Sequence, residues 1–349
     1  EIFTVEIDPS SGAQSPDTLY SQAASYSDLR VSDAYSSSTN CQLSNGDDCI
    51  LTIFEEQDVL GNNTLKVKAE VDTPISLSVD GVNQQFKDAT KTVSSSTIPS
   101  EQLFVVWEES KNGNIDIFGQ HISFDGTTLG PAEGIAICEN IAEQKNPSID
   151  YNSSLNEVMI CWDDWRNADR DVYCASVLLD DYTVTELPIT EGKAQAQINP
   201  YVKATVTDSY LVVWEESALS ESGDVFTGDP VYYYDILMQE VKSGETVYST
   251  DVVVCNAFHD QRNPRIDMLT DSGDISYLIY WEDMRSSGKE DLTNLFSQQL
   301  KINDCNGSLG GDEGFAEGSC DCIGNILDQC GVCGGDDSTC SGCTEVDAC

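Results

Sequence analysis

The hexapeptide VVWEES occurs twice in this chain, at residues 105–110 and at residues 212–217. Three weaker relatives share its order of an aromatic residue followed by two acids: TIFEEQ, ICWDDW and IYWEDM. The aromatic anchors of the five segments are Phe54, Trp107, Trp162, Trp214 and Trp281. Their spacing of about 52 to 67 residues is typical of a protein built from structural repeats.

Two further elements recur around the anchors in the same order. A Gln-x-Asn-Pro element precedes three of them, at residues 144–147, 197–200 and 261–264. An aspartate that opens a new apolar run follows three of them, at Asp116, Asp171 and Asp235. Each unit is interpreted as a Gln-x-Asn-Pro turn and four short strands bounded by Gly, Asn, Asp and Ser. Four antiparallel strands in about 50 residues match a propeller blade, so we expect an all-β, five-bladed β-propeller over residues 1–304.

The side-chain alternation of FVVWEES places Phe104 and Val106 on one face of a strand and Val105 and Trp107 on the other. Both faces are therefore apolar. This pattern favours a strand that is buried on both sides, as it would be between neighbouring blades.

The last unit is one strand short, and the N-terminal run IFTVEID, from Ile2 to Asp8, has no blade of its own. We expect this run to complete the last blade and close the ring, because an open sheet edge favours aggregation. The alternative is that the run pairs with a neighbouring molecule.

The repeat resembles β-propeller units of secreted microbial proteins that have the approximate pattern Trp-Glu-Asp-x-Arg-x-Gly-x-x-Asp-Ile-Tyr. The match is best at residues 107–109, 116–118 and 125–127, and the arginine is kept at Arg166 and Arg285. The two VVWEES copies have lost it. The resemblance covers residues from about 50 to 303 and implies a fold rather than an activity.

The charge of the chain excludes some partners. With 61 acidic and 17 basic residues, the formal net charge is −44, which repels nucleic acid and anionic membranes. No apolar run is long enough to insert into a membrane.

A strongly acidic surface attracts cations, and carboxylate oxygens are typical ligands of Ca²⁺. The densest group of acids lies in the C-terminal tail, at Asp312, Asp321, Asp328, Asp336 and Asp337. These acids do not have the spacing of an EF-hand loop. Whether they bind Ca²⁺ or are simply solvated stays open at this point, and we expect no required cofactor.

Cysteines and sequons indicate an extracellular, secreted glycoprotein. N-linked glycans are predicted at Asn62, Asn152 and Asn306. Cys41 and Cys49 are close enough in sequence to pair, and Cys161 and Cys174 fall on successive strands of one unit. Cys138 and Cys255 occupy equivalent positions in two repeats and need not pair with each other.

The segment 305–349 forms a separate module with few large apolar residues, so cross-links must hold it together. We expect disulfides among its eight cysteines: Cys305, Cys320, Cys322, Cys330, Cys333, Cys340, Cys343 and Cys349. The alternative is a zinc site at the two Cys-x-x-Cys pairs, Cys330 with Cys333 and Cys340 with Cys343. Residues 321–340 resemble the short CGVCGGD modules of secreted proteins. The chain stops within a following unit, so we expect the natural protein to continue, or to be cleaved, just beyond Cys349.

The acids after the aromatic anchors are catalytic candidates only in principle: Glu108, Asp163, Glu215 and Glu282. Because they recur in every unit, we expect them to make structural hydrogen bonds, and we assign no catalytic residue. We therefore expect a non-enzymatic structural subunit of an extracellular filament, sheath or surface layer, which self-assembles through its tail or terminal strand. The alternative is a carbohydrate-binding or glycoside-cleaving propeller.

Overall fold

The structure, a computed structural model, describes residues 2–7, 14–20, 28–42 and 48–301, with short gaps at 59, 70–74, 78–82, 94–99, 112, 168, 220–231, 258, 272–273 and 285–293. All regular structure in these residues is β-strand. No described segment forms a helix that is long and apolar enough to cross a membrane. The whole cysteine-rich segment 305–349 lies outside the described residues, and with it Asn306, the eight tail cysteines and the proposed calcium ligands.

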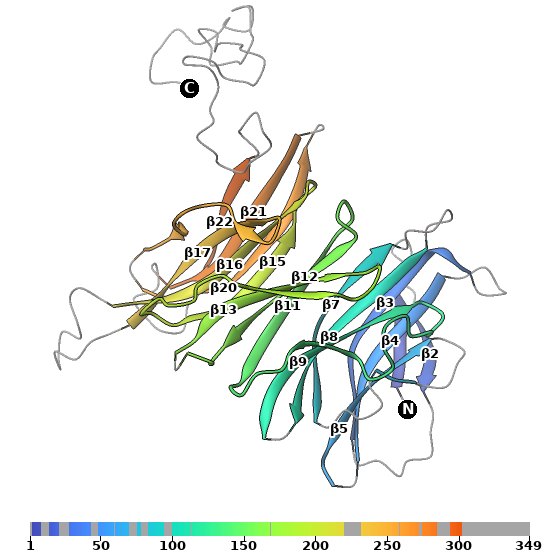
Figure 1. Cartoon of the computed structure of the whole chain (residues 1–349). Helices are drawn as coiled ribbons and strands as arrows, with labels where there is room; N and C mark the ends of the chain where they lie inside the picture. The colour runs from blue at the N-terminus through green and yellow to red at the C-terminus, as the bar shows by residue number, and fades with distance from the viewer. Residues whose placement is uncertain are drawn as a thin grey trace, which may run out of the picture.

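Five sheets follow one another in chain order, from the blue β3–β5 to the orange and red β20–β22 in Figure 1. The first sheet contains β3 (Asp28–Gln42), β4 (Asp48–Gln57), β5 (Asn63–Ala69) and β6 (Ile75–Ser76). The second contains β7 (Gln84–Val93), β8 (Glu101–Lys111), β9 (Asn114–Ser123) and β10 (Ile135–Cys138). The third contains β11 (Gln144–Asn152), β12 (Glu157–Asp164), β13 (Asp171–Leu178) and β14 (Val184–Pro188).

The fourth sheet contains β15 (Gln197–Ala204), β16 (Ser209–Leu219) and β17 (Tyr232–Lys242), with β18 (Glu245–Thr246) and β19 (Val252–Cys255) both paired to β17. The fifth contains β20 (Gln261–Asp271), β21 (Asp274–Asp283) and β22 (Asn294–Lys301). Each of the five is an antiparallel meander, and the strand that comes first in sequence lies at one edge of its sheet. The first strands of consecutive sheets, from β7 to β20, pack against one another.

The five anchors occupy equivalent places in the five sheets. Each lies on the second strand, and the apolar side chains fill one core between each pair of consecutive sheets. Trp107, Trp162 and Trp214 are completely buried, while Phe54 and Trp281 are 2% and 4% exposed. The prediction of an all-β fold of propeller-type sheets is confirmed.

The predicted closure of the ring by the N-terminal strand is wrong. β1 (Ile2–Ile7) pairs antiparallel with β2 (Gln14–Tyr20) in a separate two-stranded sheet, and the fifth sheet keeps three strands. A hairpin between neighbouring segments costs much less loop-closure entropy than a pairing across almost the whole chain. In the part of the chain that is described, no strand pairing joins the fifth sheet to the first.

The Gln-x-Asn-Pro elements are bulges in the first strands and not the predicted turns. The pairing register shifts between Lys145 and Ser148 in β11, and at the same place in β15 and β20. The asparagines there have φ angles between 51° and 54°, at Asn146, Asn199 and Asn263. Asparagine tolerates this left-handed backbone better than most residues, and the following proline has no N–H to pair. The motif therefore bends a strand instead of ending it.

The first acid after each anchor connects its sheet to the next one. Glu108 accepts a hydrogen bond of 2.7 Å from the backbone N–H of Asn146, and Glu215 accepts one of 2.9 Å from that of Asn263. Asp163 accepts a longer one, 3.3 Å, from Asn199. In the first sheet Glu55 accepts one from Phe86. We call these four contacts the latches. In the fifth sheet the equivalent acid, Glu282, is exposed.

The second acid after each anchor accepts hydrogen bonds from residues of its own sheet. Glu109 accepts hydrogen bonds from the Trp107 indole, at 3.1 Å, and from Gln84. Asp164 and Asp283 accept the indole N–H of their own anchors in the same way. The second acid therefore orients the indole of Trp107, Trp162 and Trp281, whereas in the fourth sheet Glu216 accepts from Gln197.

Two other predictions concern described side chains. A disulfide joins Cys161 to Cys174, which lie directly opposite each other on β12 and β13, whereas Cys138 and Cys255 are buried and do not pair with each other. The predicted glycan at Asn152 is wrong, because this side chain is 1% exposed and its Nδ2 donates to the carbonyls of Thr207 and Ser209. The side chain of Cys41 and that of Cys49 lie outside the description, and Asn62, in a turn, remains a predicted glycosylation site.

The latches predict a large difference between two acids at the same register. We expect Glu215→Ala to lower the free energy of unfolding by about 3 kcal/mol, because it leaves Arg262 and a bulge N–H without their buried partner. The matched exposed variant Glu282→Ala should change it by less than about 0.5 kcal/mol. Chemical denaturation of both variants measures this, and equal losses would contradict the role of the latch.

Candidate functional site

The recurring acids do not line a shared site. Glu108 is bound by Lys87 at 3.0 Å, Asp163 by Arg170 at 3.1 Å and Glu215 by Arg262 at 2.9 Å, in addition to the latch N–H groups. Each of these carboxylates is therefore engaged in structural contacts. This agrees with the structural role expected from their recurrence and leaves a catalytic function to other residues.

A pocket of about 310 Å³ lies where the first strands of the second to fifth sheets converge. We call it the central pocket. It is lined by the bulge residues and their neighbours: Lys87, Asp88, Asn146, Pro147, Ser148, Asn199, Pro200, Tyr201, Asn263 and Arg265. The bulges, which the latches hold in place, therefore also form the wall of this pocket.

One register position in this wall differs in every sheet. It pairs with the residue immediately before each anchor, and it is occupied by Asp88, Ser148, Tyr201 and Arg265. In the first sheet Asp33 has this position in the backbone pairing of β3. The neighbouring latch positions repeat, whereas this one carries an acid, a hydroxyl, a phenol and a base. The residues that differ between the repeats therefore meet at the pocket.

Asp88 is the pocket carboxyl with unusual electrostatics. Its oxygens accept the backbone N–H groups of Ile149, at 3.1 Å, and of Ala89, at 2.9 Å. Burial raises the pKa of Asp88 to about 6, and the charge of Asp150 adds to this rise, while the two N–H groups and Arg265 oppose it. A carboxyl with this pKa exchanges its proton near neutral pH, which is the property of a general acid or base.

Asp150 is held as a charged neighbour. Its carboxylate accepts hydrogen bonds from Thr90, at 3.1 Å, and from the backbone N–H of Ala204, and it forms an ion pair of 3.0 Å with Lys203. Two acids in different environments therefore lie on adjacent first strands, one with a raised pKa and one held by an ion pair. Tyr201 completes this group, and burial raises its pKa to about 12, so the phenol stays neutral.

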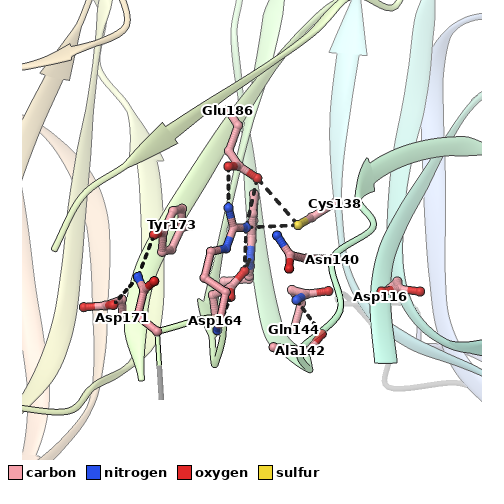
Figure 2. A network of polar contacts seen from close by, with 12 residues as sticks. Asp116, Cys138, Asn140, Ala142, Gln144, Asp164, Asp171, Tyr173 and Glu186 are labelled. Atoms are coloured by element: carbon pink, nitrogen blue, oxygen red, sulfur yellow. Dashed lines mark hydrogen bonds and ion pairs between the residues drawn. The ribbon is translucent and has the colours of Figure 1, made fainter. Parts of the chain in front are cut away.

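A second polar network lies between the outer strands of the second and third sheets (Figure 2). The Arg166 guanidinium contacts Asp164 at 2.7 Å and Glu186 at 2.6 Å, lies 4.0 Å from the centre of the Tyr173 ring, and donates to the Cys138 sulfur. Burial raises the pKa of the Cys138 thiol, which keeps it protonated. Every charged group here has a protein partner, so this network cross-links β10 to β14 and does not form a reactive site.

No group of three or more His, Cys, Asp or Glu side chains in the described part of the chain is placed to hold a metal ion. The proposed calcium ligands, from Asp312 to Asp337, are not among those residues. The calcium site therefore remains a prediction.

Neither a protein-family model nor a curated protein matches the chain. Solved structures with a similar arrangement include a thermostable family-43 glycoside hydrolase, 12% identical over 81% of this chain and 93% of that one, with a TM-score of 0.40. The family-93 α-L-arabinofuranosidase of Fusarium graminearum is 11% identical over 78% and 81%, with a TM-score of 0.41. The α-L-arabinofuranosidase of Lactobacillus brevis is 9% identical over 80% and 93%, with a TM-score of 0.37. At this level, the activities of these proteins are not carried over to this chain.

The central pocket corrects the expectation of a non-enzymatic filament, sheath or surface-layer subunit. The described residues line a polar pocket with a carboxyl of raised pKa, the kind of site that a purely structural subunit does not require. The structural-subunit hypothesis is therefore withdrawn in favour of its alternative.

Sequence reasoning missed the pocket because it searched the positions that recur. Asp88 was not singled out, although the position was visible as the variable residue after Asn-Pro in NPS, NPY and NPR. A comparison of what differs between aligned repeats would have found Ser148, Tyr201 and Arg265.

The pKa of Asp88 predicts a pH-dependent contribution to stability. The folded state holds the proton more tightly than the unfolded chain, so this contribution is largest below about pH 4 and is lost as the pH rises through about 6. The free energy of unfolding of the natural protein minus that of Asp88→Asn should fall by about 2 kcal/mol between about pH 4 and pH 6.5. Denaturant titrations across this range measure it. A difference that stays constant would contradict the buried, protonated carboxyl.

Proposed function

We propose that this protein binds a carbohydrate in the central pocket and cleaves a glycosidic bond there, with Asp88 as the proton donor. The observation that carries the proposal is the single register position at which otherwise repeated first strands present Asp88, Ser148, Tyr201 and Arg265 to one pocket.

The pocket has the composition that sugars require. Sugar hydroxyls both donate and accept hydrogen bonds, and the amides of Asn146, Asn199 and Asn263 can do the same. The Tyr201 ring offers an apolar face for the C–H groups of a pyranose or furanose. A volume of about 310 Å³ is at the lower end of ligand pockets and suits one sugar unit.

Glycoside cleavage needs a carboxylic acid that protonates the leaving oxygen and a second carboxylate that acts as a nucleophile or activates water. Asp88 supplies the first, because its proton is retained up to about pH 6. Asp150 acts as a positioning residue, because its charge raises the pKa of Asp88. Asp88 is the one carboxyl among the residues that line the central pocket, and we assign no residue to the second carboxylate.

The setting is proposed to be extracellular. The Cys161–Cys174 disulfide supports this placement, because disulfides persist in oxidising compartments. The resemblance of the repeats and of the CGVCGGD module to secreted proteins points the same way.

A panel of aryl glycosides and polysaccharides tests the proposal. We expect hydrolysis of at least one of them, a fall of about 100-fold or more in kcat for Asp88→Asn, and a loss of kcat/KM as the pH rises through about 6. The exposed-acid control Glu282→Gln should keep full activity. Failure to cleave any member of the panel, or full activity in Asp88→Asn, would refute the assignment.

A further inference from the structure

The side chain of Arg265 is exposed at the wall of the central pocket. Its guanidinium carbon lies 4.9 Å from the centre of the Tyr201 ring, and one of its nitrogens donates to the carbonyl of Pro264 at 2.8 Å. These contacts fix the direction of the guanidinium and leave most of its five donors available. No carboxylate of the described residues lies within 4.0 Å of it.

This is unusual in a chain with 61 acids and 17 bases. Ten other described basic side chains form ion pairs: Lys66, Lys87, Lys91, Lys145, Arg166, Arg170, Lys193, Lys203, Lys242 and Arg262. Arg262, only three residues away, pairs with Glu215 in a latch. With so many acids available, an arginine at the wall of a pocket that forms no ion pair with the described residues is available for a ligand.

We infer that the central pocket is selective for an anionic sugar unit, with Arg265 receiving the carboxylate or sulfate of that unit. The inference rests on the proposed binding of a carbohydrate in this pocket and adds the class of that carbohydrate. A planar guanidinium binds a carboxylate through two parallel hydrogen bonds. A neutral glycan would leave this donor pair unused, whereas a uronate or a sulfated sugar satisfies it.

The neighbouring residues are consistent with an anion. Lys87, the other cation of the wall, is already neutralised by Glu108, so Arg265 is the cation that faces the ligand. Asp88 holds its proton below about pH 6, which limits the repulsion of an anionic sugar in mildly acid conditions. Elsewhere the strongly negative surface repels anions, so selectivity for one must come from a local contact of this kind.

Calorimetry on the full chain at about pH 5.5 tests the inference. The probes are a galacturonate trimer, its fully methyl-esterified form and a sulfated galactose oligomer. We expect at least one anionic probe to bind about tenfold or more tightly than the neutral ester, and its affinity to fall with added salt. Preference for the galacturonate or for the sulfated oligomer identifies which anion is recognised.

The matched variants assign the selectivity. Arg265→Gln should bind the acidic and neutral probes equally, and Arg265→Lys should recover part of the preference, because it restores the charge without the planar fork. Lys242→Gln removes one positive charge from an exposed ion pair and should keep the full preference. Thermal melting of each variant establishes that it is folded.

The outcomes separate the two proposals. If no probe is bound, if the acidic and neutral probes bind alike, or if Arg265→Gln keeps the preference, the inference is overturned, even when a neutral glycan is cleaved. If an anionic probe binds selectively through Arg265 but no glycoside is cleaved, the inference stands and the proposed catalysis fails.

Discussion

The fold depends on one repeated contact, a buried carboxylate that accepts the backbone N–H of a bulge in the next sheet. Glu108, Asp163 and Glu215 each make it, and each is also paired with a lysine or an arginine. A bulge exposes an N–H that the strand ladder does not use, and a buried N–H without a partner is costly. The acid after each anchor accepts the hydrogen bond of this N–H and thereby also fixes the distance between consecutive sheets.

The latches also determine where chemistry can occur. They hold the bulges of neighbouring first strands close together, so that the next residues along each strand converge on the central pocket. Substitution of a latch residue is expected to destabilise the fold, whereas the converging position makes no such contact between sheets. It carries Asp88, Ser148, Tyr201 and Arg265, which provide a carboxyl of raised pKa, a hydroxyl, a ring and a cation without an ion pair among the described residues. Scaffold and site thus lie on the same strands but use different residues.

Sequence periodicity was sufficient for the fold class, because Trp107, Trp162 and Trp214 repeat with their acids and every repeat obeys the same packing constraint. The structural role of those acids also followed from their recurrence. Three features were missed for physical reasons. Asn146 and Pro147 have turn propensity but lie in a bulge, because sheet pairing continues on both sides of them. The run from Ile2 pairs locally because a short hairpin costs less entropy. A search for repetition did not find the pocket because the residues that distinguish it, Asp88, Ser148, Tyr201 and Arg265, do not repeat.

The most direct test of this account is amide hydrogen exchange, measured residue by residue by NMR. The backbone amides of Asn146, Asn199 and Asn263 lie in bulges, where unpaired N–H groups ordinarily exchange quickly. If Glu108, Asp163 and Glu215 hold them as described, these amides should exchange only by global unfolding, as slowly as those of the buried second strands. Exchange at the rate of exposed loop amides would contradict the latch, and with it the arrangement of the sheets and of the pocket.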